Sequence, residues 1–404
     1  MIKGHSRFWY FFKKSFLIFP HAGGARSDGK PYLAARELAP FYDRLHDEAG
    51  LAKRAYWRLL RMAFMAWIGP RARRLAKKHK LSDERRTVVE RIAKARYMDP
   101  RDVLINDFTT TDEPKFYVRR FEEAAINRLM NPQYWTGECE MDDKIAFAAR
   151  CERSGLPHPP LLATCVNGVI EARALPKTGE IFVKPLHGTG GIGAAAYKAP
   201  AFASLEDFKA FLKKTAGAKE DWLAQDRLGT HPALADIALN ALSTMRVYTI
   251  LDEDGRAEVV STSVKLSTHA ASVVDNGAGV GIHVGVDLET GRLGVGAGRG
   301  HVTAHEANPA NGVHFKGREM PLYRDIVEIA LRAHNEVFPD YTYAGFDLAP
   351  TDTGVWLIEG NAKASMVAAQ RPILRTMPPE RFVKLVALNM ERPAPGLTKT
   401  PPEA

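Results

Sequence analysis

The apolar and polar positions along the chain follow two patterns, one typical of strands and one typical of helices. Residues 181–183, 247–251 and 355–358 are short runs rich in β-branched and aromatic side chains, which is typical of strands. Residues 53–80 and 83–97 have longer helical patterns. Residues 142–150 form a further predicted helix with its acids at the N-terminal end, where the helix dipole favours negative charge. The pattern predicts a mixed α/β (α+β) protein with its first quarter mostly helical.

A glycine-rich loop follows the predicted strand at 181–183. The strand ends at Lys184 and Pro185, and the loop contains His187, Gly188, Thr189, Gly190 and Gly191. A lysine at a strand end beside free backbone amides suits a polyphosphate, which needs a point charge and several short donors. The spacing matches neither the Walker A motif nor the dinucleotide fingerprint. A glycine-rich hairpin whose lysine faces water is the alternative interpretation.

A second candidate site lies far downstream. The turn-rich residues 350–354 join two strand-like runs, so a hairpin is expected to bring Asp347 close to Glu359 and Asn361. Glu359 and Asn361 are two residues apart and therefore share one face of their strand. Two carboxylates and an amide oxygen are ligands that magnesium takes alongside substrate phosphates. The alternative is a solvated edge hairpin.

In this order and spacing, the segments resemble the ATP-grasp superfamily, and within it the sugar-transfer-associated branch, over roughly residues 110–375. The resemblance implies an ATP-grasp fold, in which two α/β lobes close on ATP. It implies that Lys144 reaches the phosphates opposite Lys184, and that the chain at Gln225, Asp226, Arg227 and Leu228 lies against the adenine. It also implies that Asp275 and Asn276 border the phosphates and the acceptor. Arg246, a fixed cation at a strand start, suits phosphate or acyl-phosphate binding, and Lys265 is expected to add positive charge to the same pocket. An outward-facing lysine is the other interpretation of Lys265, and for the ribose Asp236 is only a weak candidate.

The activity implied by this resemblance is that of an ATP-dependent carboxylate–amine ligase. ATP and Mg²⁺, or Mn²⁺ in its place, are the expected cofactors, and the expected substrates are a carboxylate and an amine of a polysaccharide or cell-envelope component. Three alternatives stay open. They are a kinase-like phosphoryl transferase, a non-catalytic ATP-binding protein of a polysaccharide-assembly complex, and a nucleic-acid-binding protein that uses the basic N-terminal region.

Composition and charge limit these alternatives. The chain has 404 residues, 45% of them hydrophobic and 25% charged, which is typical of a globular protein. Residues 1–100 hold 23 Lys and Arg against 9 Asp and Glu, which leaves 33 basic and 38 acidic residues for the rest. The net charge of +9 therefore belongs to the N-terminal region, and no nucleic-acid partner is expected. Three cysteines without metal spacing indicate a reducing, cytoplasmic location.

The basic N-terminal region has two interpretations. The apolar run at residues 8–20 is interrupted by Lys13 and Lys14 and is shorter than the roughly 20 residues that span a bilayer. Residues 53–80 combine aromatic and basic side chains without an acidic one. Such a helix either packs its apolar side on the body or touches the anionic inner face of a membrane through residues 1–80. The expected organisation is a basic helical region at 1–105, a catalytic domain at 106–390 and a disordered tail at 391–404.

Overall fold

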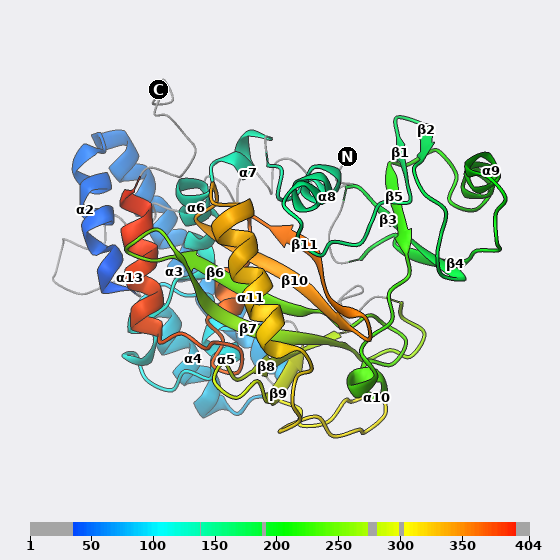
Figure 1. Cartoon of the computed structure of the whole chain (residues 1–404). Helices are drawn as coiled ribbons and strands as arrows, with labels where there is room; N and C mark the ends of the chain where they lie inside the picture. Colours follow the sequence, from blue (N-terminus) through cyan, green and yellow to red (C-terminus); the bar gives the residue numbers. More distant parts are fainter. Residues whose placement is uncertain (1–34, 138, 188–190, 274–280, 299–302, 393–404) are drawn as a thin grey trace.

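The computed structural model describes residues 35–392, except residue 138 and residues 188–190, 274–280 and 299–302. Two antiparallel sheets and a group of helices make up this part of the chain (Figure 1). Five predicted site residues lie outside the described residues, namely Gly188, Thr189, Gly190, Asp275 and Asn276. Residues 393–404 of the predicted tail and residues 1–34 of the N-terminal region also lie outside them.

The smaller sheet has five strands in the order β2-β1-β5-β3-β4. Its strands are β1 (Ala163–Val166), β2 (Val169–Ala172), β3 (Glu180–Pro185), β4 (Ala195–Lys198) and β5 (Trp222–Asp226). Helix α9 (Leu205–Thr215) buries Phe208 and Leu212 in a core with Ile181 and Trp222. This sheet carries Lys184 near the end of β3.

The larger sheet has six strands in the order β11-β10-β6-β7-β8-β9. Its strands are β6 (Met245–Leu251), β7 (Ala257–Ser267), β8 (Gly281–Val286), β9 (Leu293–Gly298), β10 (Tyr343–Thr351) and β11 (Gly354–Asn361). The turn between Thr351 and Gly354 closes the β10–β11 hairpin, so the predicted hairpin is confirmed. The predicted mixture of helices and strands is confirmed as well.

Helices cover both faces of the larger sheet. On one face, Phe346 and Leu348 of β10 pack in the same core as Phe147 of α8 (Lys144–Arg153) and Ile326 of α11 (Tyr323–Arg332), which continues into a π-helical turn at Ala333–Val337. On the other face, Tyr343 of β10 packs in the core of α13 (Pro379–Glu391). Short helical turns join these elements at η3 (Pro232–Leu234), α10 (Ala235–Ala238) and α12 (Met366–Ala369).

The N-terminal helices pack at the side of the molecule away from the smaller sheet (Figure 1). They are η1 (Arg36–Leu38), α2 (Ala39–Glu48), α3 (Leu51–His79), α4 (Asp83–Arg96), α5 (Pro100–Ile105), η2 (Glu113–Phe116) and α6 (Arg120–Met130). The short helix α7 (Gln133–Thr136) lies between this group and α8 in the view of Figure 1. Phe64 of α3 shares a core with Val367 of α12, so these helices pack against the C-terminal part of the chain. The expected boundary at residue 105 stays a prediction. In the described residues, every helix is too short or too polar to cross a bilayer.

Candidate functional site

Three charged residues lie in one row across the larger sheet. Glu359 of β11 lies directly opposite Asp347 of β10, and Asp347 lies opposite Arg246 of β6. Directly paired residues of neighbouring strands project from the same face of a sheet. The pairing of β10 with β11 and with β6 therefore brings two carboxylates and a guanidinium together, although Arg246 and Asp347 are 101 residues apart in the chain.

Asp347 is the buried centre of this row. Its residue is only 2% exposed, and both of its carboxylate oxygens accept from Arg246, with 2.7 Å between Arg246 Nη2 and Oδ2. Lys265 of β7 donates to the same Oδ2 at 2.5 Å. Burial alone would raise the pKa of Asp347, but Arg246 and Lys265 outweigh it and hold that pKa below its usual range. Lys265 is thus buried against an acid and does not face water.

Arg246 is held in place by its surroundings. Its guanidinium lies 5.6 Å from the centre of the Tyr248 ring, and its Nη2 is 3.8 Å from Oε1 of Glu359. Gly345 leaves room for it, since a Cβ at this position would lie 3.3 Å from Arg246 Cδ and 2.8 Å from the Ala364 side chain. Arg246 therefore presents a fixed positive charge between Asp347 and Glu359.

Two lysines approach the same acid from outside the larger sheet. Burial lowers the pKa of Lys184 to about 8, while Glu359 acts to raise it and Lys144 to lower it further. The first residue of α8, Lys144, donates to the carbonyl of Leu186 at 2.9 Å. Its pKa is also lowered by burial, against the attraction of Glu359. The structure thus brings Lys144, Lys184, Arg246 and Glu359 into one electrostatic cluster, which we call the central cluster.

Asp142 belongs to this cluster but is missing from the sequence-based site. Its Oδ1 accepts from the backbone N–H of Ala362 at 2.8 Å, just beyond β11. Burial and the nearby charge of Glu359 raise its pKa, and the Ala362 bond and Lys144 oppose this increase. In the sequence, Asp142 has the pattern of an acid at a helix start. Only its packing against the end of β11 distinguishes it from the true cap, Asp143, whose Oδ1 accepts from Ile145 N and Ala146 N.

The predicted metal ligands can be tested for their fit to a divalent cation. Among the described residues, no group of three or more His, Cys, Asp or Glu is arranged to hold a metal, and the predicted set has only two acids. The Glu359 side chain is 39% exposed, and it lies near both Asp142 and Asp347. Asn361 donates from Nδ2 to Gly345 O at 3.4 Å, so this bond does not use the amide oxygen. Glu359 and the Asn361 amide oxygen are of the ligand type that magnesium takes, whereas both carboxylate oxygens of Asp347 already accept from Arg246 or Lys265.

The residues predicted to line the adenine have side chains engaged elsewhere. Gln225 donates to Pro159 O at 2.7 Å, and Asp226 accepts from Lys177 N at 2.9 Å. Arg227 pairs with Glu180 at 2.8 Å. Leu228 lies in the loop after β5. Only their backbone groups would face a nucleotide, as the resemblance implies, and this role stays a prediction.

For three other predicted residues, the structure shows no direct contact with the central cluster among the described residues. The His187 side chain is 84% exposed and lies 3.8 Å from the Asp221 carboxylate. Gly191 has a φ of +71°, in the region that favours glycine, as expected for the loop. The ribose candidate Asp236 pairs with Arg318 at 2.8 Å.

Two histidines near the cluster were not assigned a role from sequence. Burial and the charge of Lys184 lower the pKa of His158 to about 3. His283 of β8 lies opposite Lys265, and burial together with Lys265 and Arg246 lowers its pKa to about 3. Both imidazoles are therefore neutral at neutral pH. The alternation of β8 would have placed His283 on a face, but only the strand register places it beside Lys265.

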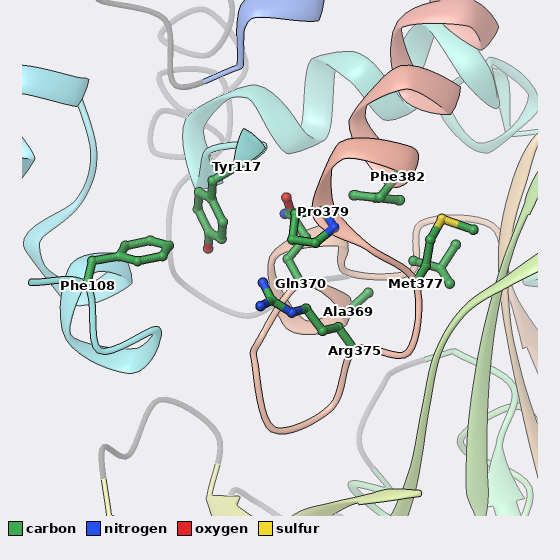
Figure 2. Close-up of a pocket in the computed structure, with 9 residues that line it drawn as sticks. Phe108, Tyr117, Ala369, Gln370, Arg375, Met377, Pro379 and Phe382 are labelled. Atoms are coloured by element: carbon green, nitrogen blue, oxygen red, sulfur yellow. The ribbon is translucent and has the colours of Figure 1, made fainter. Parts of the chain in front are cut away.

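Figure 2 shows a separate pocket beneath α13. None of the predicted site residues lines it. Its walls come mainly from aromatic and aliphatic side chains, with Gln370 and Arg375 as the polar exceptions; the lining residues are Phe108, Tyr117, Val260, Ala369, Gln370, Arg375, Met377, Pro379 and Phe382. It encloses about 340 Å³, part of it open to solvent. The pocket differs in character from the charged central cluster.

Comparison with known families agrees with the architecture. The sequence profile of the family described as sugar-transfer associated ATP-grasp matches residues 127–375, which is more than half of the chain. The chain therefore belongs to the sugar-transfer-associated ATP-grasp family and has the ATP-grasp fold. The match includes β3, α8 and the β10–β11 hairpin, which carry the central cluster. No curated protein sequence matched the chain.

Solved structures give more distant similarities. A D-alanyl-alanine synthetase A from Vibrio cholerae O1 biovar eltor is 14% identical over 63% of this chain and 65% of its own, with a TM-score of 0.34. An L-amino acid ligase from Bacillus licheniformis is 12% identical over 72% and 60%, with a TM-score of 0.37. A biotin carboxylase from Campylobacter jejuni is 11% identical over 63% and 47%, with a TM-score of 0.36. The chain thus covers less than two thirds of each of these proteins.

Proposed function

We propose that the protein is an ATP-dependent carboxylate–amine ligase that releases ADP and forms a C–N bond. One observation carries the proposal, namely the convergence of Lys144, Lys184 and Arg246 on the half-exposed Glu359. Three cations around one partly exposed acid exceed what that acid needs for neutralisation. They suit a ligand with several negative charges, such as a triphosphate.

The proposed reaction has two steps. A carboxylate oxygen of the first substrate attacks the γ-phosphorus of ATP, the bond from that phosphorus to the bridging oxygen breaks, and ADP leaves. The product is an acyl phosphate. The amine nitrogen of the second substrate then attacks the acyl carbon, the bond to the phosphate oxygen breaks, and inorganic phosphate leaves. The nitrogen loses a proton, which the departing phosphate can accept.

The side chains of the cluster act mostly by position and charge. Lys184 and Lys144 would bind the phosphate oxygens from one side of the cleft, and Arg246 would face the transferred group from the sheet. Asp347 has a positioning role, because it holds Arg246 and Lys265 in fixed orientations. Fixed cations stabilise developing negative charge without reorganisation during the step.

Glu359 and Asn361, with Asp347 beside them, would hold the magnesium ion. When bound, such an ion would supply positive charge that offsets the charge of the phosphates. Burial and, to a smaller extent, the nearby charge of Glu359 raise the pKa of Asp142, and a cation at this place would relieve the repulsion between the two acids.

The test is a screen of carboxylate and amine pairs read out by ADP and phosphate release. A ligase requires both substrates for full turnover and releases one phosphate for each amide. Glu359→Gln should abolish this release, whereas Glu289→Gln, an exposed glutamate in the β8–β9 turn, should retain it. ADP release with a hydroxyl acceptor and no amine would indicate a kinase-like transferase instead. ATP binding without turnover over the whole panel would indicate a non-catalytic ATP-binding protein.

The family description supports a role in building or modifying a polysaccharide or cell-envelope component. We place the protein in the cytoplasm, at the inner face of the membrane where such polymers are assembled. An activity that depends on a lipid-linked or polymeric sugar acceptor would support this location.

A further inference from the structure

The longest helix of the described chain has two different faces. The inner face of α3 is packed into the body, and its buried residues are Trp57, Leu60, Phe64, Ile68, Ala72, Leu75 and Ala76. The opposite side chains are all exposed, at the spacing of three and four that defines one helical face. We call this surface the α3 outer face; it consists of Ala52, Ala55, Tyr56, Leu59, Met62, Ala63, Ala66, Pro70, Arg73, Arg74, Lys77 and Lys78.

The first half of the α3 outer face is apolar. Leu59 is 64% exposed, Met62 is 68% exposed and Tyr56 is 45% exposed. Alanines at 52, 55, 63 and 66 separate these larger side chains, and every one of them is exposed. Apolar side chains of this size normally pack against something, so a row of them on one helix indicates a contact surface.

The second half of the α3 outer face is basic, and among the described residues its positive charges are not neutralised by nearby acids. Arg73, Arg74, Lys77 and Lys78 are exposed, and Lys80 follows at the helix end. Within residues 35–392, as far as the structure describes them, none of these five forms an ion pair. On the neighbouring α4, Asp83 pairs with Arg86 at 3.2 Å and Glu90 with Lys94 at 2.6 Å. Helix α3 itself contains no acidic residue.

We infer that the α3 outer face binds the surface of an anionic lipid bilayer. The apolar half supplies side chains that insert at the boundary of headgroups and acyl chains, and the basic half attracts the anionic headgroups. The two halves follow one another along a helix of 29 residues, which at 1.5 Å per residue gives a contact about 43 Å long. The inference goes beyond the proposed ligase activity and does not depend on it.

Such a contact is compatible with ligand access to the central cluster. Helix α3 belongs to the N-terminal helices, and the smaller sheet that carries Lys184 lies on the other side of the molecule (Figure 1). Because the inner face of α3 is part of a shared core with Tyr97 and Val367, the helix would lie on the bilayer without leaving the body. A membrane surface bound through α3 would therefore leave nucleotide access unchanged.

The experiment is flotation of the full chain with vesicles of phosphatidylserine and phosphatidylcholine, compared with vesicles of phosphatidylcholine alone. We expect binding only to the anionic vesicles, and a decrease at high salt because the attraction is screened. The double substitution Arg73→Gln with Arg74→Gln should lower the partition coefficient roughly 25-fold, about fivefold for each charge. Leu59→Ser with Met62→Ser should lower the binding that remains at high salt.

The matched control is Lys213→Gln with Lys214→Gln on α9, which removes the same charge from an exposed helix of the smaller sheet. This control should float like the unsubstituted protein. Equal losses in the two double variants, or no flotation with anionic vesicles, would overturn the inference. So would duplex DNA or RNA that binds more tightly than vesicles and depends on Arg73 and Arg74. Circular dichroism melting should be unchanged in every variant, because all substituted side chains are exposed.

Discussion

Nζ of Lys265 lies 2.5 Å from Oδ2 of Asp347, and Arg246 holds the same carboxylate. Lys265 and Asp347 are 82 residues apart in the chain, on strands β7 and β10. Strand β6 lies between these strands and carries Arg246, so the three side chains link β7, β6 and β10 at the centre of the larger sheet. One buried acid thus compensates two buried cations beside the proposed phosphate site.

Loss of the Asp347 charge should destabilise the protein strongly. Asp347→Asn leaves Arg246 and Lys265 buried without a counter-ion, and removal of one side of a buried ion pair costs about 3–5 kcal/mol. Lys265→Met should cost less, because Arg246 still neutralises Asp347. Urea unfolding measures both changes. Asp352→Asn in the exposed β10–β11 turn is the control and should unfold like the unsubstituted protein. A smaller loss in Asp347→Asn than in Lys265→Met would contradict this account.

Glu359→Ala and Lys184→Ala should each abolish the stabilisation by ATP and magnesium. Glu359 is half-exposed, and among the described residues no ion pair joins it to Lys184, so the fold should remain intact. A thermal-shift assay with and without MgATP measures the effect, and circular dichroism checks the fold. The control is Glu289→Ala. If both variants kept the full ATP-dependent shift, the proposed nucleotide site would be wrong.

ATP affinity should fall as the pH rises through about 8. The pKa of Lys184 in the free protein is lowered by burial to about 8, so the lysine is charged below this pH and neutral above it. A polyphosphate binds the charged form, so binding near pH 8 takes up a proton. Calorimetry in two buffers with different ionisation enthalpies measures this uptake. Lys184→Arg, which stays charged, should remove the step, and an affinity that is flat from neutral to alkaline pH would refute the prediction.

The lowered pKa of Lys184 also makes the free energy of unfolding depend on pH, in a direction that can be predicted. Between about 8 and the ordinary lysine value of about 10.4, the unfolded chain holds a proton that the folded protein lacks. The contribution of Lys184 to the free energy of unfolding therefore increases as the pH rises through this window. Chemical unfolding of Lys184→Met across the same pH range should lack this increase.

Asp142 should matter more for its oxygen than for its charge. Asp142→Ala removes the acceptor of Ala362 N–H, and a buried donor left without a partner costs about 1–3 kcal/mol. Asp142→Asn keeps an acceptor oxygen and removes the repulsion from Glu359, so its stability should stay near that of the unsubstituted protein. Guanidinium unfolding compares the two variants. Equal losses would mean that the charge, and not the hydrogen bond, is what the fold requires.

Phe64→Ala should destabilise the whole protein and not only α3. Phe64 is 3% exposed and lies 5.4 Å from the Tyr97 ring and 5.0 Å from the Phe121 ring, centre to centre. Removal of a buried aromatic ring costs about 3–5 kcal/mol. Calorimetry should show a single transition at lower temperature. Met62→Ala, on the exposed side of the same helix, should have little effect; a separate early transition in Phe64→Ala would show that α3 unfolds independently.

Much of the local structure was predictable because short-range rules decide it. The run before Lys184 forms a strand as its β-branched residues predict, and Asp143 begins α8 as a capping acid. The β10–β11 hairpin forms where the turn residues 350–354 indicate, so the pairing of Asp347 with Glu359 follows from the sequence. Of the two interpretations of residues 53–80, packing on the body holds for the inner face of α3, whereas Leu59 and Met62 on its outer face are exposed.

Sequence reasoning could not find contacts between distant segments. Asp142, His158 and His283 lie near the central cluster because β5, β8 and β11 bring separate stretches of the chain together, and no local pattern encodes these neighbours. Likewise, Asp226 and Arg227 were noted for the adenine, but their side chains bind residues 177–180. The spacing of residues predicts on which face of its own strand or helix a side chain lies. It does not predict which other element packs against that face.

The sequence by itself indicated the family, the mixture of helices and strands, and a candidate set of acids, lysines and arginine for a nucleotide site. Only the tertiary structure decided that Asp347 is compensated by Arg246 and Lys265, and that Glu359 is the acid near Lys144 and Lys184. The reason is physical. Strand propensity and turn chemistry act over a few residues, whereas charge compensation depends on which strands pair and how deeply each group is buried.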